Sequence, residues 1–194
     1  MNLRVQLVVA LAVICSVAAF AQAHDTPFQV RYAANVGPGS AGDSVINITN
    51  TGASGGNICV NVYTFSPDEQ EVSCCSCVVT PNGLVSLSVK NDLISNTLTP
   101  AVPSAVVVKL LSTTGGACNA AAPGALAAGL AAWGTTVHAA PAGSAVTETS
   151  FTPATLSAAE LARIAGLCGF IQSNGSGFGI CRSCRTGALG ATKQ

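Results

Sequence analysis

The sequence predicts a mainly β protein, an antiparallel immunoglobulin-like β-sandwich with one C-terminal helix and a disulfide-stapled C-terminal loop. Three observations carry this prediction. Short apolar and β-branched runs recur along the chain with Gly-, Pro- or Asn-containing turn signals between them, which is the pattern of a β-sandwich. A helical spacing of apolar residues occurs late in the chain. Eight of the nine cysteines follow an export-like leader, and an even number there favours disulfides.

The first residues are typical of an export signal. Arg4 precedes an uncharged apolar run from Val5 to Phe20, and Ala21-Gln22-Ala23 is a small-x-small cleavage site. The run falls short of the ~20 residues that a membrane span requires. We therefore expect residues 1–23 to be a signal peptide. We expect the mature protein to contain no membrane span and to be secreted or periplasmic.

The expected elements follow at regular spacing. Strands are expected at residues 28–34 and 44–50, in a hairpin from Cys59 to Val79, and at residues 84–89, 105–111, 133–139 and 146–151. Residues 120–132 are interrupted by proline and glycine, so we expect a loop with one helical turn. The sandwich then comprises residues 24–152. Residues 153–187 form a helix and a cysteine-rich lid packed on the sandwich in the same domain, and residues 188–194 form a flexible tail.

The hairpin determines where four cysteines point. A turn at the polar tip, residues 66–70, places Phe65 opposite Glu71. A constant register then makes Cys59 face Cys77, and we expect a disulfide between them. Because side chains alternate between the two faces of a strand, the expected core face collects Ile58, Val60, Val62, Val72, Cys74 and Val78. The other face collects Cys59, Asn61, Tyr63, Phe65, Cys75 and Cys77.

The remaining cysteines are expected to attach the C-terminal lid. Adjacent Cys74 and Cys75 point to opposite faces, so we expect them to bond to different partners, with Cys75 tethering the segment from Cys168 to Cys184. Beyond the hairpin the connectivity stays open, because eight cysteines allow about 105 pairings. The disulfide candidates are Cys59, Cys74, Cys75, Cys77, Cys118, Cys168, Cys181 and Cys184.

A helix is expected after Ser157, which forms a capping box with Glu160. The apolar residues that follow fall on one helical stripe, which comprises Leu161, Ile164, Leu167, Cys168 and Ile171. We expect this stripe to dock on the outer, cysteine-bearing face of the hairpin.

Composition and motifs point away from several function classes. Only 8% of the residues are charged and the net charge is zero, so no basic patch indicates nucleic-acid binding. The sequence lacks a nucleophile elbow of the G-x-S-x-G type. Cys181-x-x-Cys184 allows a redox motif, or a zinc site with Cys74 and Cys77. A structural disulfide role is favoured because exported thiols oxidise.

The mature N-terminus offers a metal-site hypothesis. Cleavage after Ala23 makes His24 the first residue, and its amino group and ring nitrogen can chelate a metal, with a second histidine completing a copper brace. This arrangement resembles the copper site of lytic polysaccharide monooxygenases and related β-sandwich copper proteins. The resemblance implies His24 and His138 as copper ligands, with Tyr32 or Phe151 as an axial neighbour.

We expect an exported, non-enzymatic protein without a cofactor, which has a structural, adhesive or surface-binding role. Its partners would be cell-surface or extracellular-matrix components, and nucleic acid is not among them. The copper-binding protein is one alternative. The other is a small carbohydrate-binding module, for which Trp133, Tyr32 and Tyr63 are the candidate stacking residues.

Overall fold

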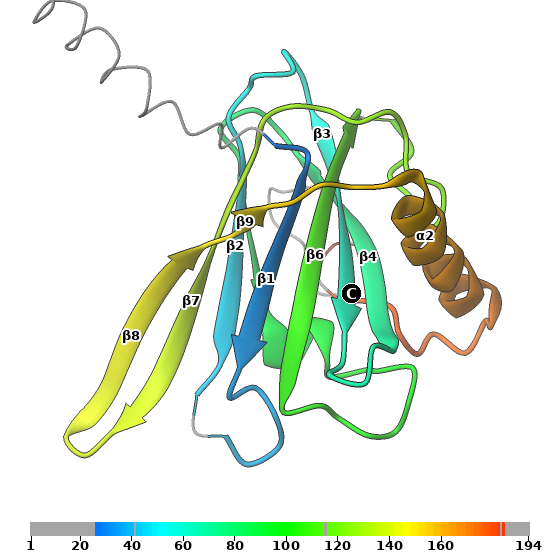
Figure 1. The fold of residues 1–194 in the computed structure, drawn as a ribbon. Helices are drawn as coiled ribbons and strands as arrows, with labels where there is room; N and C mark the ends of the chain where they lie inside the picture. Colours follow the sequence, from blue (N-terminus) through cyan, green and yellow to red (C-terminus); the bar gives the residue numbers. More distant parts are fainter. Residues whose placement is uncertain (1–25, 41, 115, 183, 185–194) are drawn as a thin grey trace, which may run out of the picture.

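The computed structural model describes residues 26–40, 42–114, 116–182 and 184. Within these residues, two antiparallel sheets, one α-helix and a short π-helical turn make up the fold (Figure 1). The five-stranded sheet has the order β4 (Glu71–Val79), β3 (Ile58–Phe65), β6 (Ala105–Thr114), β1 (Phe28–Ala34) and β9 (Thr152–Pro153). The four-stranded sheet has the order β5 (Leu84–Ser88), β2 (Ser44–Asn50), β7 (Leu130–Ala140) and β8 (Gly143–Ser150). The predicted fold, a mainly β sandwich with one C-terminal helix, is confirmed; its immunoglobulin-like topology stays a prediction.

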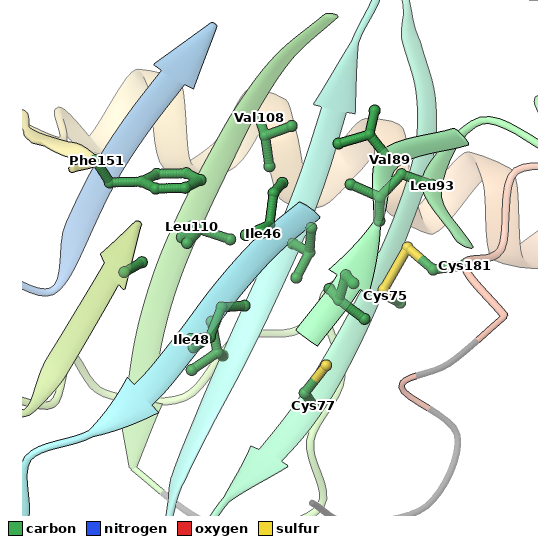
Figure 2. Close-up of a cluster of buried hydrophobic side chains, with 14 of the residues drawn as sticks. Ile46, Ile48, Cys75, Cys77, Val89, Leu93, Val108, Leu110, Phe151 and Cys181 are labelled. Carbon is green, nitrogen blue, oxygen red and sulfur yellow. A yellow bond between two sulfur atoms is a disulfide. The ribbon is translucent and has the colours of Figure 1, made fainter. Parts of the chain in front are cut away.

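The inner faces of the two sheets form the main core, as Figure 2 shows. Ile46 and Ile48 of β2 face Val108 and Leu110 of β6, and all four side chains are fully buried. The residues of β2 alternate between buried and partly exposed, as expected for a strand with one face on the core and one on solvent. The outer face of the four-stranded sheet is therefore left accessible.

Helix α2 (Ala158–Ser173) covers the outer face of the other sheet beside β4 (Figure 1). It buries Ile164, Cys168 and Ile171 against a second apolar cluster that includes Tyr63 and Phe65. The predicted stripe is thus confirmed for these three residues, and it docks on the outer face of the hairpin, where it meets Cys74 and not the predicted Cys75 and Cys77. Leu161 and Leu167, which belong to the same stripe, are only partly buried.

The start of α2 confirms half of the predicted capping box. The Glu160 backbone N–H donates to Ser157 Oγ at 3.1 Å, which satisfies one free donor of the first turn. The Glu160 carboxylate does not reach back to the cap. It instead accepts from Lys109 of β6 and from Arg163 of the next turn, so it joins the helix to the sheet.

The hairpin register differs from the prediction by one residue over most of its length. Phe65 does lie opposite Glu71, but the pairing shifts between Thr64 and Phe65, after which Cys59 lies opposite Val78. A β-bulge inserts one extra residue in one strand, and a one-residue slip moves every later side chain to the other face. Cys75, Cys77 and Val79 consequently lie in the main core, where the prediction had Cys74 and Val78.

Some elements extend beyond their predicted limits. Strand β7 begins at Leu130, inside the segment expected to be a loop, and β6 continues to Thr114. The short strand β9 and a five-residue π-helical turn, η2 (Val89–Leu93), were not predicted. Val89 and Leu93 of η2 are buried, which explains why an apparently polar segment folds back on the core.

The chain after α2 covers the free edge of β4. The Cys74 N–H donates to the Gly179 carbonyl at 2.8 Å, and the Cys181 N–H donates to the Cys74 carbonyl at 3.2 Å. The Leu98 N–H meets the Val72 carbonyl on the same edge. Covering an edge in this way prevents pairing with other chains. Within the described residues, no helix is both long enough and apolar enough to cross a bilayer; the predicted signal peptide and tail lie outside them.

Candidate binding face on the four-stranded sheet

The structure joins all eight candidate cysteines in four disulfides. The pairs are Cys59–Cys118, Cys74–Cys168, Cys75–Cys181 and Cys77–Cys184. The predicted Cys59–Cys77 bridge is therefore wrong, because the bulge turns the two residues to opposite faces of the sheet. The predictions that Cys74 and Cys75 have different partners, and that Cys75 tethers the C-terminal segment, are confirmed.

Because these eight cysteines are all paired, none of them offers the free thiol that the redox motif or the zinc site requires. Cys181 and Cys184 each bond to a different β4 cysteine, so they form neither a redox pair with each other nor half of a zinc site. In the described part of the chain, one group has metal-ligand spacing, namely Glu71, Cys74 and Cys168. Its two sulfur atoms are bonded to each other, so the group does not bind a metal in this state.

The copper hypothesis depends on a residue that the structure does not cover, because His24 lies outside the described residues. His138 is on β7, where its Nε2 lies 2.9 Å from Thr147 Oγ1. The two axial candidates are separated: Phe151 is buried in the main core, whereas Tyr32 is exposed on β1. The copper site thus stays a prediction.

The three candidate stacking residues do not share one surface. Tyr63 is fully buried, and its hydroxyl donates to the Ala120 carbonyl at 2.8 Å. Tyr32 lies on the five-stranded sheet, and Trp133 lies on β7 of the other sheet. Trp133 belongs to neither core cluster and is partly exposed. Trp133 is therefore the stacking candidate on the accessible face of the four-stranded sheet.

The neighbours of Trp133 come from the adjacent strands. Trp133 lies opposite Asn47 of β2 and opposite Ser150 of β8. Because residues that pair directly across strands share a face, all three point outward. The outward positions of β7 continue with Thr135, which lies opposite Glu148 of β8.

A chain of hydrogen bonds crosses the four strands beside the indole. Ser86 Oγ on β5 donates to Asn47 Oδ1 at 2.7 Å, and Asn47 Nδ2 donates to Thr135 Oγ1 at 3.2 Å. The Thr135 hydroxyl then donates to Glu148 Oε1 at 3.3 Å. Each side chain is thereby held in one orientation, while unused lone pairs and protons remain for a ligand.

A shallow hollow of about 370 Å³ adjoins the indole at the β7–β8 side. It is lined by Ala131, Ala132, Trp133, Glu148, Thr149 and Ser150. An open site with one aromatic surface and a few fixed polar groups suits a flat, hydroxyl-rich molecule, because the ring provides apolar contact and the polar groups fix orientation. We refer to Trp133, Asn47, Thr135, Ser86 and Glu148 as the tryptophan face.

Comparisons with known proteins give little further information. The chain matches no protein-family model and no curated protein. One solved structure, Thermotoga maritima 1070, is similar at 11% sequence identity with a TM-score of 0.44, covering 69% of this chain and 98% of that one.

Sequence reasoning identified Trp133 but missed its polar neighbours. The period-two alternation of residues 44–50 was visible, and it puts Asn47 on the same face as Val45 and Thr49. Which strand lies beside which could not be read from alternation, because β2 pairs with β7 across eighty or more residues of sequence. Asn47 and Glu148 therefore meet Trp133 only in the folded sheet.

Proposed function

We propose that this protein is an exported, non-enzymatic β-sandwich that binds glycan-bearing surfaces through the tryptophan face. The observation that carries the proposal is the row of hydrogen-bonded side chains across all four strands beside a partly exposed indole. This proposal combines an adhesive role with carbohydrate as the ligand. The partners would be cell-surface or extracellular-matrix polysaccharides.

The chemistry of the face favours a sugar over other ligands. An indole contacts the apolar C–H face of a pyranose ring, and amide, hydroxyl and carboxylate groups exchange hydrogen bonds with its hydroxyls. Glu148 is the one charged side chain of the tryptophan face, so a strongly anionic polymer would be repelled. We therefore expect neutral polysaccharides to bind best.

Export is supported by the cysteine chemistry. Four disulfides persist in oxidising compartments and are rare where thiols are kept reduced. Together with the leader, they favour a secreted or periplasmic protein. Low charge on the surface suits a protein whose contacts are made by hydroxyl and amide groups rather than by ion pairs.

The test is a binding assay against a panel of insoluble neutral and anionic polysaccharides, using the mature, oxidised protein. Trp133→Ala should abolish retention on a neutral polymer, because stacking on one aromatic side chain supplies much of the contact. Tyr32→Ala is the matched control, since it removes an exposed aromatic residue from the other sheet. Retention lost equally in both variants, or in neither, would contradict the proposal.

A further inference from the structure

Glu71 is a buried acid without a structural partner. It is 5% exposed, and neither of its carboxylate oxygens has a hydrogen-bond partner among the described residues. One carboxylate oxygen and the sulfur atoms of Cys74 and Cys168 all lie within 4.8 Å of one another. The acid is thus placed beside a disulfide.

The two cations that act on the Glu71 carboxyl are bound to another acid. Lys109 of β6 and Arg163 of α2 both contact Glu160, and both cations lie over the Phe65 ring. Lys109 and Arg163 lower the pKa of Glu71, but burial has the larger effect, and the pKa is raised to about 8. That value is nearer to the pKa of about 8.5 for a free thiol than an ordinary carboxyl pKa is, which favours proton transfer from a thiol to this carboxylate.

The Cys74–Cys168 bridge closes as the helix docks, while solvent access to the two sulfur atoms is being lost. The two residues are 94 positions apart and belong to β4 and α2, so they meet only when the helix docks on the sheet. Docking leaves both fully buried. By contrast, the Cys59–Cys118 bridge has a partly exposed cysteine, Cys118, which solvent bases can reach.

We propose that Glu71 is the proton acceptor that closes the Cys74–Cys168 disulfide during oxidative folding. A small-molecule disulfide, such as oxidised glutathione, first forms a mixed disulfide with one of the two cysteines and releases one thiol. The ionised form of Glu71, which is the minor form at pH 7, accepts the S–H proton of the other cysteine, whose thiolate attacks the protein sulfur of the mixed disulfide. The new S–S bond forms, the bond to the small thiol breaks, and that thiolate leaves with the electron pair and is then protonated.

The test is oxidative refolding of the full mature chain in a glutathione redox buffer, with alkylation at intervals and peptide mapping of each bridge. Glu71→Gln keeps the shape of the side chain but cannot accept the proton. It should slow closure of Cys74–Cys168 on the order of 10- to 100-fold at pH 7, leaving Cys59–Cys118 unchanged. Glu69→Gln, at the exposed hairpin tip, is the control and should close both bridges at the normal rate.

The pH dependence separates proton transfer from helix docking. Near pH 9 the thiols can ionise in solvent before the helix docks, so the deficit of the Glu71→Gln protein should largely disappear. A deficit of equal size at pH 7 and pH 9 would place the effect in docking and overturn the proposal. Unchanged closure, or equal slowing of both bridges, would overturn it as well.

Discussion

The buried carboxyl of Glu71 makes a specific prediction about stability and pH. Replacing it by glutamine removes the titrating group but retains its size and polarity. Burial raises the pKa of Glu71 from 4.5 to about 8 in the folded protein. The folded state therefore binds a proton more tightly than the unfolded state does. Protonation stabilises the fold fully below pH 4.5, and this contribution is lost as the pH rises to 8.

The size of the effect follows from the two pKa values. Each pH unit in this interval is worth about 1.4 kcal/mol, so the whole interval corresponds to roughly 5 kcal/mol, an upper limit if the site relaxes. Glu160 acts in the opposite direction: its contacts with Arg163 and Lys109 lower its pKa. Its contribution is lost only on acidification below about pH 4.5, outside the interval that Glu71 controls.

Denaturant unfolding at pH 5, 6, 7 and 8, with the disulfides intact, measures this dependence. The parent protein should lose stability from pH 5 to pH 8, whereas Glu71→Gln should be nearly flat and more stable at pH 8. Glu69→Gln, whose side chain is exposed, should follow the parent. Parallel curves for the parent and Glu71→Gln would refute the reasoning, because they would show that Glu71 is ionised in the fold.

Two further predictions concern packing. A Cβ at Gly134 would lie 1.9 Å from Cζ of buried Arg31, so Gly134→Ala should lower the free energy of unfolding by roughly 1–3 kcal/mol. In a double-mutant cycle, an Arg31→Ala background should relieve most of that loss. Additive losses would show that the two residues do not contact. In the same unfolding assay, Ile164→Ala should lower the free energy of unfolding by roughly 2–5 kcal/mol, and Ser157→Ala by only about 1 kcal/mol. Equal and negligible losses for the two variants would mean that α2 is not docked.

The sequence was sufficient for the strands and the helix because their patterns are local. Alternation of side chains located β1 and β2 at their observed limits, and a cap followed by an apolar stripe located α2. The hairpin faces could not be obtained in this way. One extra residue near Thr64 moved Cys75 and Cys77 into the core, and nothing in the local pattern marks that bulge.

The candidate site was harder to predict than the fold because it is assembled from four strands. Trp133 was identified from its residue type alone. Its hydrogen-bonded neighbours Asn47 and Glu148 lie on the strands that flank β7, and the order β5-β2-β7-β8 is a property of the whole sandwich. The Cys59–Cys118 pairing could not be predicted for the same reason, because it depends on where the chain after β6 returns to β3.

The most direct test of the tryptophan face uses its own fluorescence. The chain contains one tryptophan, so a change in its emission reports on Trp133 without any substitution. Titration of the mature protein with soluble oligosaccharides of the polymer that retains it should give a saturable change in emission, and the binding constant should agree with calorimetry. Calorimetric binding with no change in tryptophan emission would place the ligand elsewhere and contradict the account.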